Sequence, residues 1–297
     1  MGIRKGIKIT LIIGISIVVL VPLVLIGLGR RLLHDSSIPQ QELLFRADSA
    51  KTILAFFPHP DDEVTVAGTL MKMNNVGHRV ILVCLTQGEA ADTNGAYTPE
   101  ELAEIRTLEM NHAAEVIGAE YLELLSYPDG GLANMGVDSI KSIALQAIQK
   151  FKPDALISYD SKVGLYGHPD HKLTGLALEQ LFQDMVGKSG FSPRALFQVT
   201  LSPKQIDLAM KMSKGFQENY PIDPTQGLPN PSFYIKTTAY FDRVMEVVSG
   251  HASQAETLQD LLPYHDVVPG FIYSRIFDRE YFYEVPTKKP PVQVAFR

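Results

Sequence analysis

The stretch TILAFFPHPDDEV, residues 52–64, joins an apolar run to a dense cluster of polar side chains. The first six residues are typical of a β-strand. His59, Asp61 and Asp62 follow directly, so one imidazole and two adjacent carboxyl groups lie where the strand ends. In open parallel sheets, ligands bind at the carboxyl ends of the strands. The stretch therefore predicts a ligand site at one edge of a sheet.

The same pattern recurs in YGHPDHK, residues 166–172, which follows the strand-like DALISYD, residues 154–160. Proline suits the first position of a helix, because its missing N–H would have no partner within the helix. Pro60 and Pro169 therefore each predict a helix that begins at the sheet edge. The chain contains two strand, His-Pro-Asp, helix units on separate strands.

The spacing within the two units separates their side chains by direction. Residues three apart share one face of a helix, so His59 lies with Asp62, and His168 lies with His171. Asp61 lies between its neighbours and must point elsewhere. The two adjacent acids can therefore have different roles.

Two histidines and one carboxylate are a known ligand set of catalytic zinc, with a fourth position left for water. Without thiolates, the same set is compatible with Fe(II) or Mn(II). A bound cation would also offset the repulsion between the adjacent acids. The alternative is that the acids only complement a helix N-terminus, with His59 as a cap. The repetition of the pattern on two strands favours a metal site.

Strand-like and helix-like segments alternate along the chain. This alternation predicts a Rossmann-like, three-layer α/β fold, in which helices cover both faces of a mostly parallel sheet. After a region with many Pro and Gly residues, 201–235, we expect one more helix at 240–262 and an edge strand at 279–285. The other strands are expected at 52–57, 79–86, 120–125, 154–160 and 194–200, and the other helices at 63–75, 99–118, 137–151 and 169–186.

Residues 9–28 form a run of twenty residues without a charge, long enough to cross a bilayer as a helix. A cleaved signal peptide is the alternative, but the run is longer than such a segment and no typical cleavage site follows. We therefore predict a membrane anchor and flank at 1–35, a linker at 36–50 and a catalytic domain at 51–297. More basic residues precede the run than follow it, which favours a single-pass protein with an extracytoplasmic domain.

The charge balance beyond residue 35 is acidic, with 22 Lys and Arg against 32 Asp and Glu. A net charge of about −10 argues against nucleic acid as a partner. The only cysteine, Cys84, excludes an intramolecular disulfide and a thiolate-rich metal cluster. It lies in a strand-like segment and is expected in the core.

The two turns, HPDDE at 59–63 and HPDH at 168–171, resemble those of the LmbE-like and PIG-L-type metal-dependent N-acetylglucosamine deacetylases. Further segments match family motifs in the same order, so the resemblance extends over about 52–255. They are LTQGEA (85–90), EIRTLEMNHAAEVIG (104–118), YPDGGL (127–132) and GHASQ (250–254). One departure is AGT at 67–69, where the family often has two glycines, and it concerns helix packing more than chemistry.

This resemblance implies a role for each matching residue. His59, Asp62 and His171 would bind the metal. Asp61 would be the general base, and His168 would stabilise the oxyanion or act as an acid. The substrate-binding residues would be Arg106, Asp129 and Tyr166.

The resemblance implies a zinc-dependent hydrolase that removes the N-acetyl group from an N-acetylglucosamine-containing glycan, glycolipid or glycoconjugate. Two alternatives stay open: an amidase on a larger sugar conjugate, and a non-catalytic glycan-binding relative. A two-metal phosphoesterase would need more ligands than the motifs supply. His251 and Gln254 are expected either to line the site or to cap a late helix, and Arg106 to pair with Glu109 if it does not serve the site.

Overall fold

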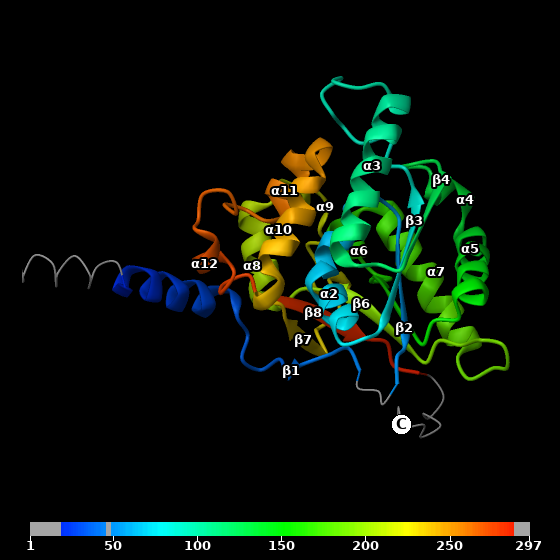
Figure 1. The fold of residues 1–297 in the computed structure, drawn as a ribbon, viewed down its shortest axis with the longest axis horizontal. Coiled ribbons are helices and arrows are strands. Elements are labelled where there is room, and N and C mark those ends of the chain that lie inside the picture. Colours follow the sequence, from blue (N-terminus) through cyan, green and yellow to red (C-terminus); the bar gives the residue numbers. More distant parts are fainter. Residues whose placement is uncertain (1–18, 46–48, 288–297) are drawn as a thin grey trace, which may run out of the picture.

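Five parallel strands form the centre of the molecule (Figure 1). Each is parallel to its neighbours, in the order β4-β3-β2-β5-β6. The earliest of these strands, β2, is therefore central, and the chain winds outward from it in both directions. Such an order creates a switch point between β2 and β5, where ligands bind in this fold class. The bounds are β2 Thr52–Phe57, β3 Arg79–Thr86, β4 Tyr121–Tyr127, β5 Ala155–Tyr159 and β6 Ala195–Thr200.

The structure is a computed structural model that describes residues 19–45 and 49–287. Within these residues three more strands extend the sheet beyond β6, in the order β8, β7 and β1. Strand β8, Arg279–Glu284, is antiparallel to both neighbours, β6 and β7. The prediction of an edge strand there is wrong in position, because β7, Phe233–Lys236, pairs along its other side. Strand β1, Gln40–Gln41, pairs with β7 from within the predicted linker.

Helices cover both faces of the sheet, as predicted (Figure 1). On one face, Ile53, Ala55 and Phe57 of β2 belong to the core that includes α2, α3 and α10. On the other face, Leu54 and Phe56 belong to the core that includes α5 and α7. These helices are α2 Ala67–Asn75, α3 Pro99–Ile117, α5 Val137–Phe151, α7 Pro169–Met185 and α10 Phe241–Gly250.

Shorter helices connect these elements and cover the end of the sheet beside β6 and β8 (Figure 1). The helix predicted at 240–262 is divided, because the chain turns at His251 between α10 and α11. The Pro- and Gly-bearing region 201–235 contains two helices, α8 and α9, that the sequence does not predict. The bounds are η1 Asp62–Val66, α4 Leu132–Met135, α6 Gly164–Gly167, α8 Pro203–Met212, α9 Lys214–Asn219, η2 Pro224–Gln226, η3 Thr238–Tyr240, η4 Ala252–Gln254, α11 Ala255–Leu261 and α12 Gly270–Tyr273.

The predicted membrane anchor is corrected by the structure. Residues 9–18 of the predicted span lie outside the described residues. Residues 19–33 are helical. Across 19–45 and 49–287, no helix combines the length and the apolar character needed to cross a membrane. This finding contradicts the prediction of a single-pass protein with an extracytoplasmic domain, and nothing in the described residues supports bilayer contact through 9–28.

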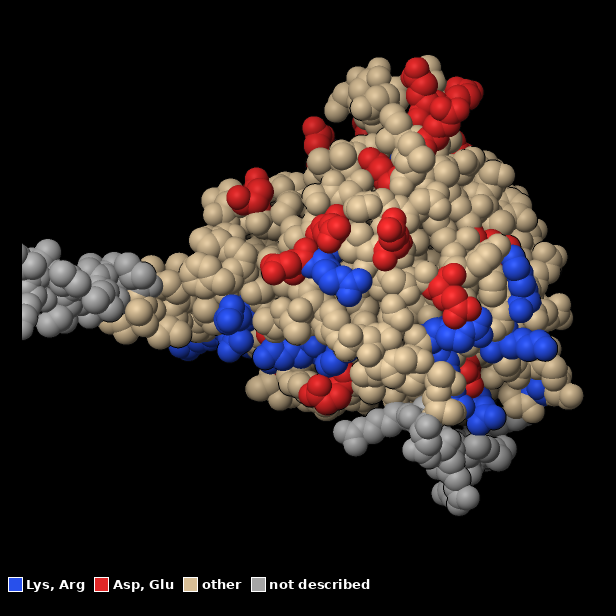
Figure 2. Space-filling view, in the orientation of Figure 1, with Lys and Arg blue, Asp and Glu red and all other residues tan. Residues whose placement is uncertain are grey.

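Charged side chains are unevenly distributed on the face drawn in Figure 2. Acidic side chains gather at the end of the molecule where α3 begins, and its first turn contains Glu100 and Glu101. Lys and Arg side chains lie mostly along the opposite end of this face. The acidic end is the one toward which β2 and β3 run, so the site at the carboxyl ends of these strands lies on the acidic side.

Candidate active site

The turn after β2 contains a backbone conformation that is rare outside glycine. Asp61 has φ 93° and ψ −20°, in the left-handed region, directly before η1 begins at Asp62. A non-glycine residue there costs about 1–3 kcal/mol and persists only when its surroundings hold it. The unusual backbone separates the two adjacent carboxyl groups. The Asp61 carboxylate accepts a hydrogen bond from Arg106, whereas the Asp62 carboxylate accepts one from the hydroxyl of Tyr159.

The side chains of His59, Asp62 and His171, the three predicted metal ligands, lie close together. His59 Nδ1 lies 3.2 Å from His171 Nε2 and 3.6 Å from Asp62 Oδ2. His171 Nε2 lies 3.2 Å from Asp62 Oδ1. Ligands about 2.1 Å from a tetrahedral zinc would be about 3.4 Å apart. The three side chains therefore match the spacing of ligands around one small cation.

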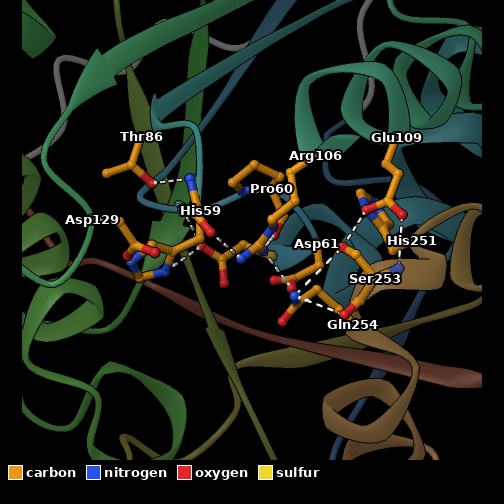
Figure 3. Close-up of polar contacts among 12 residues, drawn as sticks. His59, Pro60, Asp61, Thr86, Arg106, Glu109, Asp129, His251, Ser253 and Gln254 are labelled. Atoms are coloured by element: carbon orange, nitrogen blue, oxygen red, sulfur yellow. Dashed lines mark hydrogen bonds and ion pairs between the residues drawn. The ribbon is translucent and has the colours of Figure 1, made fainter. Parts of the chain in front are cut away.

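Surrounding groups hold these three side chains in place. Asp62 accepts hydrogen bonds from the Tyr159 hydroxyl and the His59 backbone N–H, both at 2.8 Å. The second nitrogen of His59, Nε2, faces Asp129 Oδ1 at 3.0 Å (Figure 3). It also faces Asp170 Oδ2 at 3.5 Å. A histidine that binds a metal usually directs its other nitrogen to a carboxylate in this way. The site fits a divalent cation on this observation.

His168 offers a second grouping of possible ligands. Nitrogens of His59, His168 and His171 all lie within 4.8 Å of one another. The His168 ring centroid is 4.9 Å from that of His59 and 4.7 Å from that of His171. His168 Nδ1 accepts the backbone N–H of Asp170 at 3.3 Å, so its Nε2 is the nitrogen left for a substrate or a cation.

The acids and histidines strongly perturb one another. Burial lowers the pKa of His59, but the carboxylates of Asp129, Asp170 and Asp62 outweigh this and raise the pKa well above its usual value. Burial disfavours the Asp62 carboxylate, yet His171 and His59 hold its pKa well below the usual range. Burial lowers the pKa of His171 to about 3. A cation bound here would displace protons from these ligands, as metal binding generally does.

Asp61 lies against a buried arginine. Arg106 Nη2 donates to Asp61 Oδ2 at 2.8 Å and to the carbonyl of Pro60 (Figure 3). Its Nη1 donates to the carbonyl of Gly88 at 3.0 Å. Burial raises the pKa of Asp61 to about 6, although the Arg106 cation opposes this shift. Gly88 has φ +71°, and a Cβ there would lie 2.4 Å from Arg106 Cζ. The glycine of LTQGEA thus allows the guanidinium to approach the turn.

All eight residues that the sequence assigned to the site line one cavity of about 820 Å³. Asp129 contacts His59 and accepts the Ala90 backbone N–H at 3.0 Å. The Tyr166 ring lies beside both histidines of the second turn, with centroids 6.1 Å from His168 and 5.3 Å from His171. The eight are His59, Asp61, Asp62, Arg106, Asp129, Tyr166, His168 and His171.

Of the late motif GHASQ, residues 250–254, one of the two residues expected at the site lines the cavity and the other does not. Gln254 lines the cavity, but His251 is fully buried and bonded to Glu63 at 2.6 Å. Ser253 binds Glu109 through its N–H and its hydroxyl, at 2.8 and 2.7 Å (Figure 3). Glu109 is therefore engaged by Ser253, whereas the carboxylate partner of Arg106 is Asp61.

Sequence reasoning missed two residues that contact the proposed ligands, Tyr159 and Asp170. Asp170 was visible inside HPDH, as the acid between two histidines, and is 1% exposed. Tyr159 had only a weak signal, its position at the end of a strand. Its ring also stacks on His171 at 4.1 Å, with an interplanar angle of 4°.

Comparison with known proteins agrees with this geometry. Residues 54–182 match the model of the family described as PIG-L: GlcNAc-PI de-N-acetylase. A probable N-acetyl-α-D-glucosaminyl L-malate deacetylase 2 of Bacillus anthracis is 32% identical over 132 residues, which cover 43% of this chain and 58% of that protein. The diacetylchitobiose deacetylase of Thermococcus kodakarensis is 30% identical over 129 residues, or 43% and 48% of the two chains. The chain thus spans about half the length of these curated relatives, whose names describe hydrolases of amide C–N bonds.

The fold is also shared with solved structures. The N,N′-diacetylchitobiose deacetylase from Pyrococcus horikoshii, complexed with its inhibitor, has a TM-score of 0.59 at 22% sequence identity. The match covers 80% of this chain and 85% of that one. The family match includes both His-Pro-Asp turns, the strand β5 and residues 54–57 of β2. Its motifs, its relatives and its fold agree in supporting a likeness of residues 54–182 to the PIG-L, or LmbE-like, deacetylase family.

Proposed function

We propose that this protein is a metal-dependent hydrolase that removes the N-acetyl group from an N-acetylglucosamine-containing glycan, glycolipid or glycoconjugate. The proposed catalytic domain is 51–297. The main support is the convergence of two imidazoles and one carboxylate, 3.2–3.6 Å apart, in a cavity that also contains a second carboxylate. The names of the two curated relatives support the substrate class.

His59, Asp62 and His171 would hold the divalent ion. Zinc suits two nitrogens and one oxygen, and Fe(II) or Mn(II) is also compatible with this set. A bound ion would supply Lewis acidity, which polarises an amide carbonyl and makes water a better nucleophile at neutral pH.

Asp61 is the proposed general base. Its left-handed backbone directs its carboxylate to Arg106, while Asp62 remains with the two histidines. A carboxylate with a pKa of about 6 is ionised at neutral pH and can accept a proton from the attacking water.

His168 is the proposed acid that gives a proton to the leaving amine. Burial and the neighbouring His59 lower the pKa of His168, so its imidazole is mostly neutral at neutral pH and would pass to the amine the proton that Asp61 takes from the attacking water. Arg106, Asp129 and Tyr166 would bind the sugar. Burial raises the pKa of Tyr166 above its usual value, so the phenol stays protonated and can donate a hydrogen bond to the oxyanion.

The direct test is acetate release by the full-length protein, measured across free, lipid-linked and polymeric N-acetylated sugars. We expect about one equivalent of metal per chain and loss of activity in a chelator, restored by added zinc. A purified protein that contains no metal and keeps its activity in a chelator would overturn the proposal. Sugar binding without acetate release would instead support a glycan-binding relative.

The size of the cavity favours a second candidate, an amidase that acts on a larger sugar conjugate. The cavity of about 820 Å³ extends from the histidines to apolar side chains of α8 and α11, including Leu208, Met212 and Leu261. An acetylated monosaccharide would leave much of this space unfilled. Comparing one glucosaminide as its acetamide and as bulkier amides separates the candidates, since an amidase of this kind would prefer the bulkier acyl group.

A further inference from the structure

A buried ion pair lies directly behind the proposed base and has no part in the chemistry described above. His251 Nε2 is 2.6 Å from Glu63 Oε1, and both side chains are 0% exposed. Glu63 lies in η1, and His251 lies at the end of α10, 188 positions later in the chain. Neither residue is among those that line the cavity. Any effect of this pair on catalysis must therefore be transmitted through another residue.

The second oxygen of Glu63 identifies that residue. Glu63 Oε2 accepts the backbone N–H of Asp61 at 3.0 Å. An unbroken series of contacts therefore runs from His251 to Glu63 and on to the Asp61 peptide. Asp61 has φ 93°, and this left-handed conformation needs support from its surroundings to persist.

We propose that Glu63 and His251 are positioning residues that hold the Asp61 peptide in its left-handed conformation. In this conformation the Asp61 carboxylate meets Arg106 and lies in the cavity, away from the ligand Asp62. The inference rests on the proposed function, because it assumes that Asp61 is the general base. It also explains why the late motif GHASQ belongs to the site although His251 does not reach the cavity.

The competing explanation is that Glu63 only anchors the segment 250–254 and has no effect on Asp61. The chain contains a matched control for this explanation. Glu109 holds Ser253 of the same late segment through two hydrogen bonds, but it does not contact Asp61. Glu63→Met and Glu109→Met each remove one carboxylate that anchors residues 250–254. Only the first also removes the acceptor of the Asp61 N–H.

The test compares kcat, KM and zinc content of these variants with those of the wild type. We expect Glu63→Met to lower kcat about 100-fold, the cost of a small misplacement of a catalytic group. The KM and the zinc content of Glu63→Met should not change, because Glu63 does not line the cavity and its side chain bonds to the Asp61 N–H and to His251, not to the proposed metal ligands. Glu109→Met should keep kcat within about 3-fold of the wild type.

Glu63→Gln distinguishes position from charge. The glutamine oxygen still accepts the Asp61 N–H, so this variant should recover most of the lost kcat. A role through negative charge alone would instead make it as slow as Glu63→Met. If Glu63→Met fails to fold, the double variant Glu63→Met/His251→Leu replaces the buried pair by two apolar side chains, an exchange that is often tolerated. A crystal structure of Glu63→Met, or of the double variant, should show Asp61 with a negative φ and without its contact to Arg106.

The possible results separate this inference from the proposed function. If the wild type releases no acetate from any substrate, the proposed function fails, whereas the change at Asp61 can still be measured by crystallography. If the wild type is active and Glu63→Met retains full kcat or an unchanged Asp61 conformation, the inference fails alone. Equal losses in Glu63→Met and Glu109→Met would also overturn it, because they would assign the effect to a loosened segment.

Discussion

At the scale of single residues, the adjacent acids Asp61 and Asp62 differ in environment more than in chemistry. Asp62 is enclosed by His59, His171 and Tyr159, whereas Asp61 contacts Arg106. Their pKa values move in opposite directions, since burial raises that of Asp61 and the histidines lower that of Asp62. Groups whose pKa values are separated in this way often divide acid–base work between them.

Asp61→Asn tests this division. Asparagine keeps the size of the side chain but cannot accept a proton from water. We expect kcat to fall by about 10²–10⁴-fold, the usual contribution of a general base. The zinc content, measured by elemental analysis, should stay at one equivalent because Asp61 is not a proposed ligand. Retained turnover would show that Asp61 is not the general base. Loss of zinc would show that Asp61 is a metal ligand.

At the scale of elements, the start of α3 is stabilised by a capping box. The Thr98 hydroxyl accepts the N–H of Glu101 at 3.2 Å, and the Glu101 carboxylate accepts the N–H of Thr98 at 2.9 Å. Pro99 occupies the first helical position, and Gly118, with φ 80°, ends the helix as predicted. This helix carries Arg106 to the site.

Thr98→Ala should lower the free energy of unfolding by about 1 kcal/mol, because it leaves an N–H of the first turn without its partner. Urea denaturation followed by circular dichroism would measure this loss. Glu104→Ala, an exposed change in the middle of the same helix, serves as control and should have a smaller effect. Equal effects of the two variants would contradict a capping role.

The start of α2 depends on a carboxyl group from a distant strand. Glu280 of β8 accepts the N–H groups of Gly68 and Thr69 at 2.9 and 2.8 Å. Burial raises the pKa of Glu280 to about 7, although these hydrogen bonds oppose the shift. A raised pKa in the folded state means that its stabilising contribution is complete below the usual value of about 4.5 and is lost as the pH rises through 7.

Glu280→Gln should therefore remove part of the pH dependence of stability. Relative to the variant, the wild type should lose on the order of 1 kcal/mol of unfolding free energy between pH 5 and pH 8. Urea titrations at the two pH values measure this difference. The exposed Glu115→Gln in α3 is the matched control and should give the same difference from the wild type at both pH values. A wild type that gains stability relative to Glu280→Gln at pH 8 would contradict the sign.

At the scale of the whole molecule, the proposed ligands join segments that are far apart in sequence. His59 and Asp62 follow β2, and His171 lies in α7 after β5, with the switch point of the sheet between these strands. A cation held by all three would bind the folded chain in preference to the unfolded chain. Ligand binding of this kind stabilises the folded state by mass action.

Zinc at 100 times its dissociation constant should therefore stabilise the protein by about 2.7 kcal/mol relative to the chelated form. Thermal unfolding with and without chelator would measure the shift in Tm. His171→Ala should remove the response to zinc, whereas His112→Ala, an exposed position on α3, should retain it. A Tm that responds to zinc equally in both variants would place the ion elsewhere.

Local patterns predicted the central elements well. Strands 52–57 and 79–86 and helix 137–151 have the predicted bounds, because each combines a clear apolar pattern with turn residues at its ends. The sequence does not predict α8, α9 and β7 in the region 201–235, because short helices and strands depend on tertiary contacts more than on local preference. The position of β8 inside the sheet likewise depends on β7, a pairing that no local pattern specifies.

The sequence by itself determined the central α/β fold, because two His-Pro-Asp turns each carry their own strand and helix signals. The resemblance of its motifs to the PIG-L family indicated the eight residues that line the cavity. Only the tertiary structure decided how these residues meet. It brought Asp129 and Asp170 to His59, and Arg106 to Asp61. It also carried His251 across 188 positions to Glu63, behind the left-handed turn at Asp61. Such contacts depend on the packing of whole elements around the sheet, which the spacing of residues along one segment does not encode.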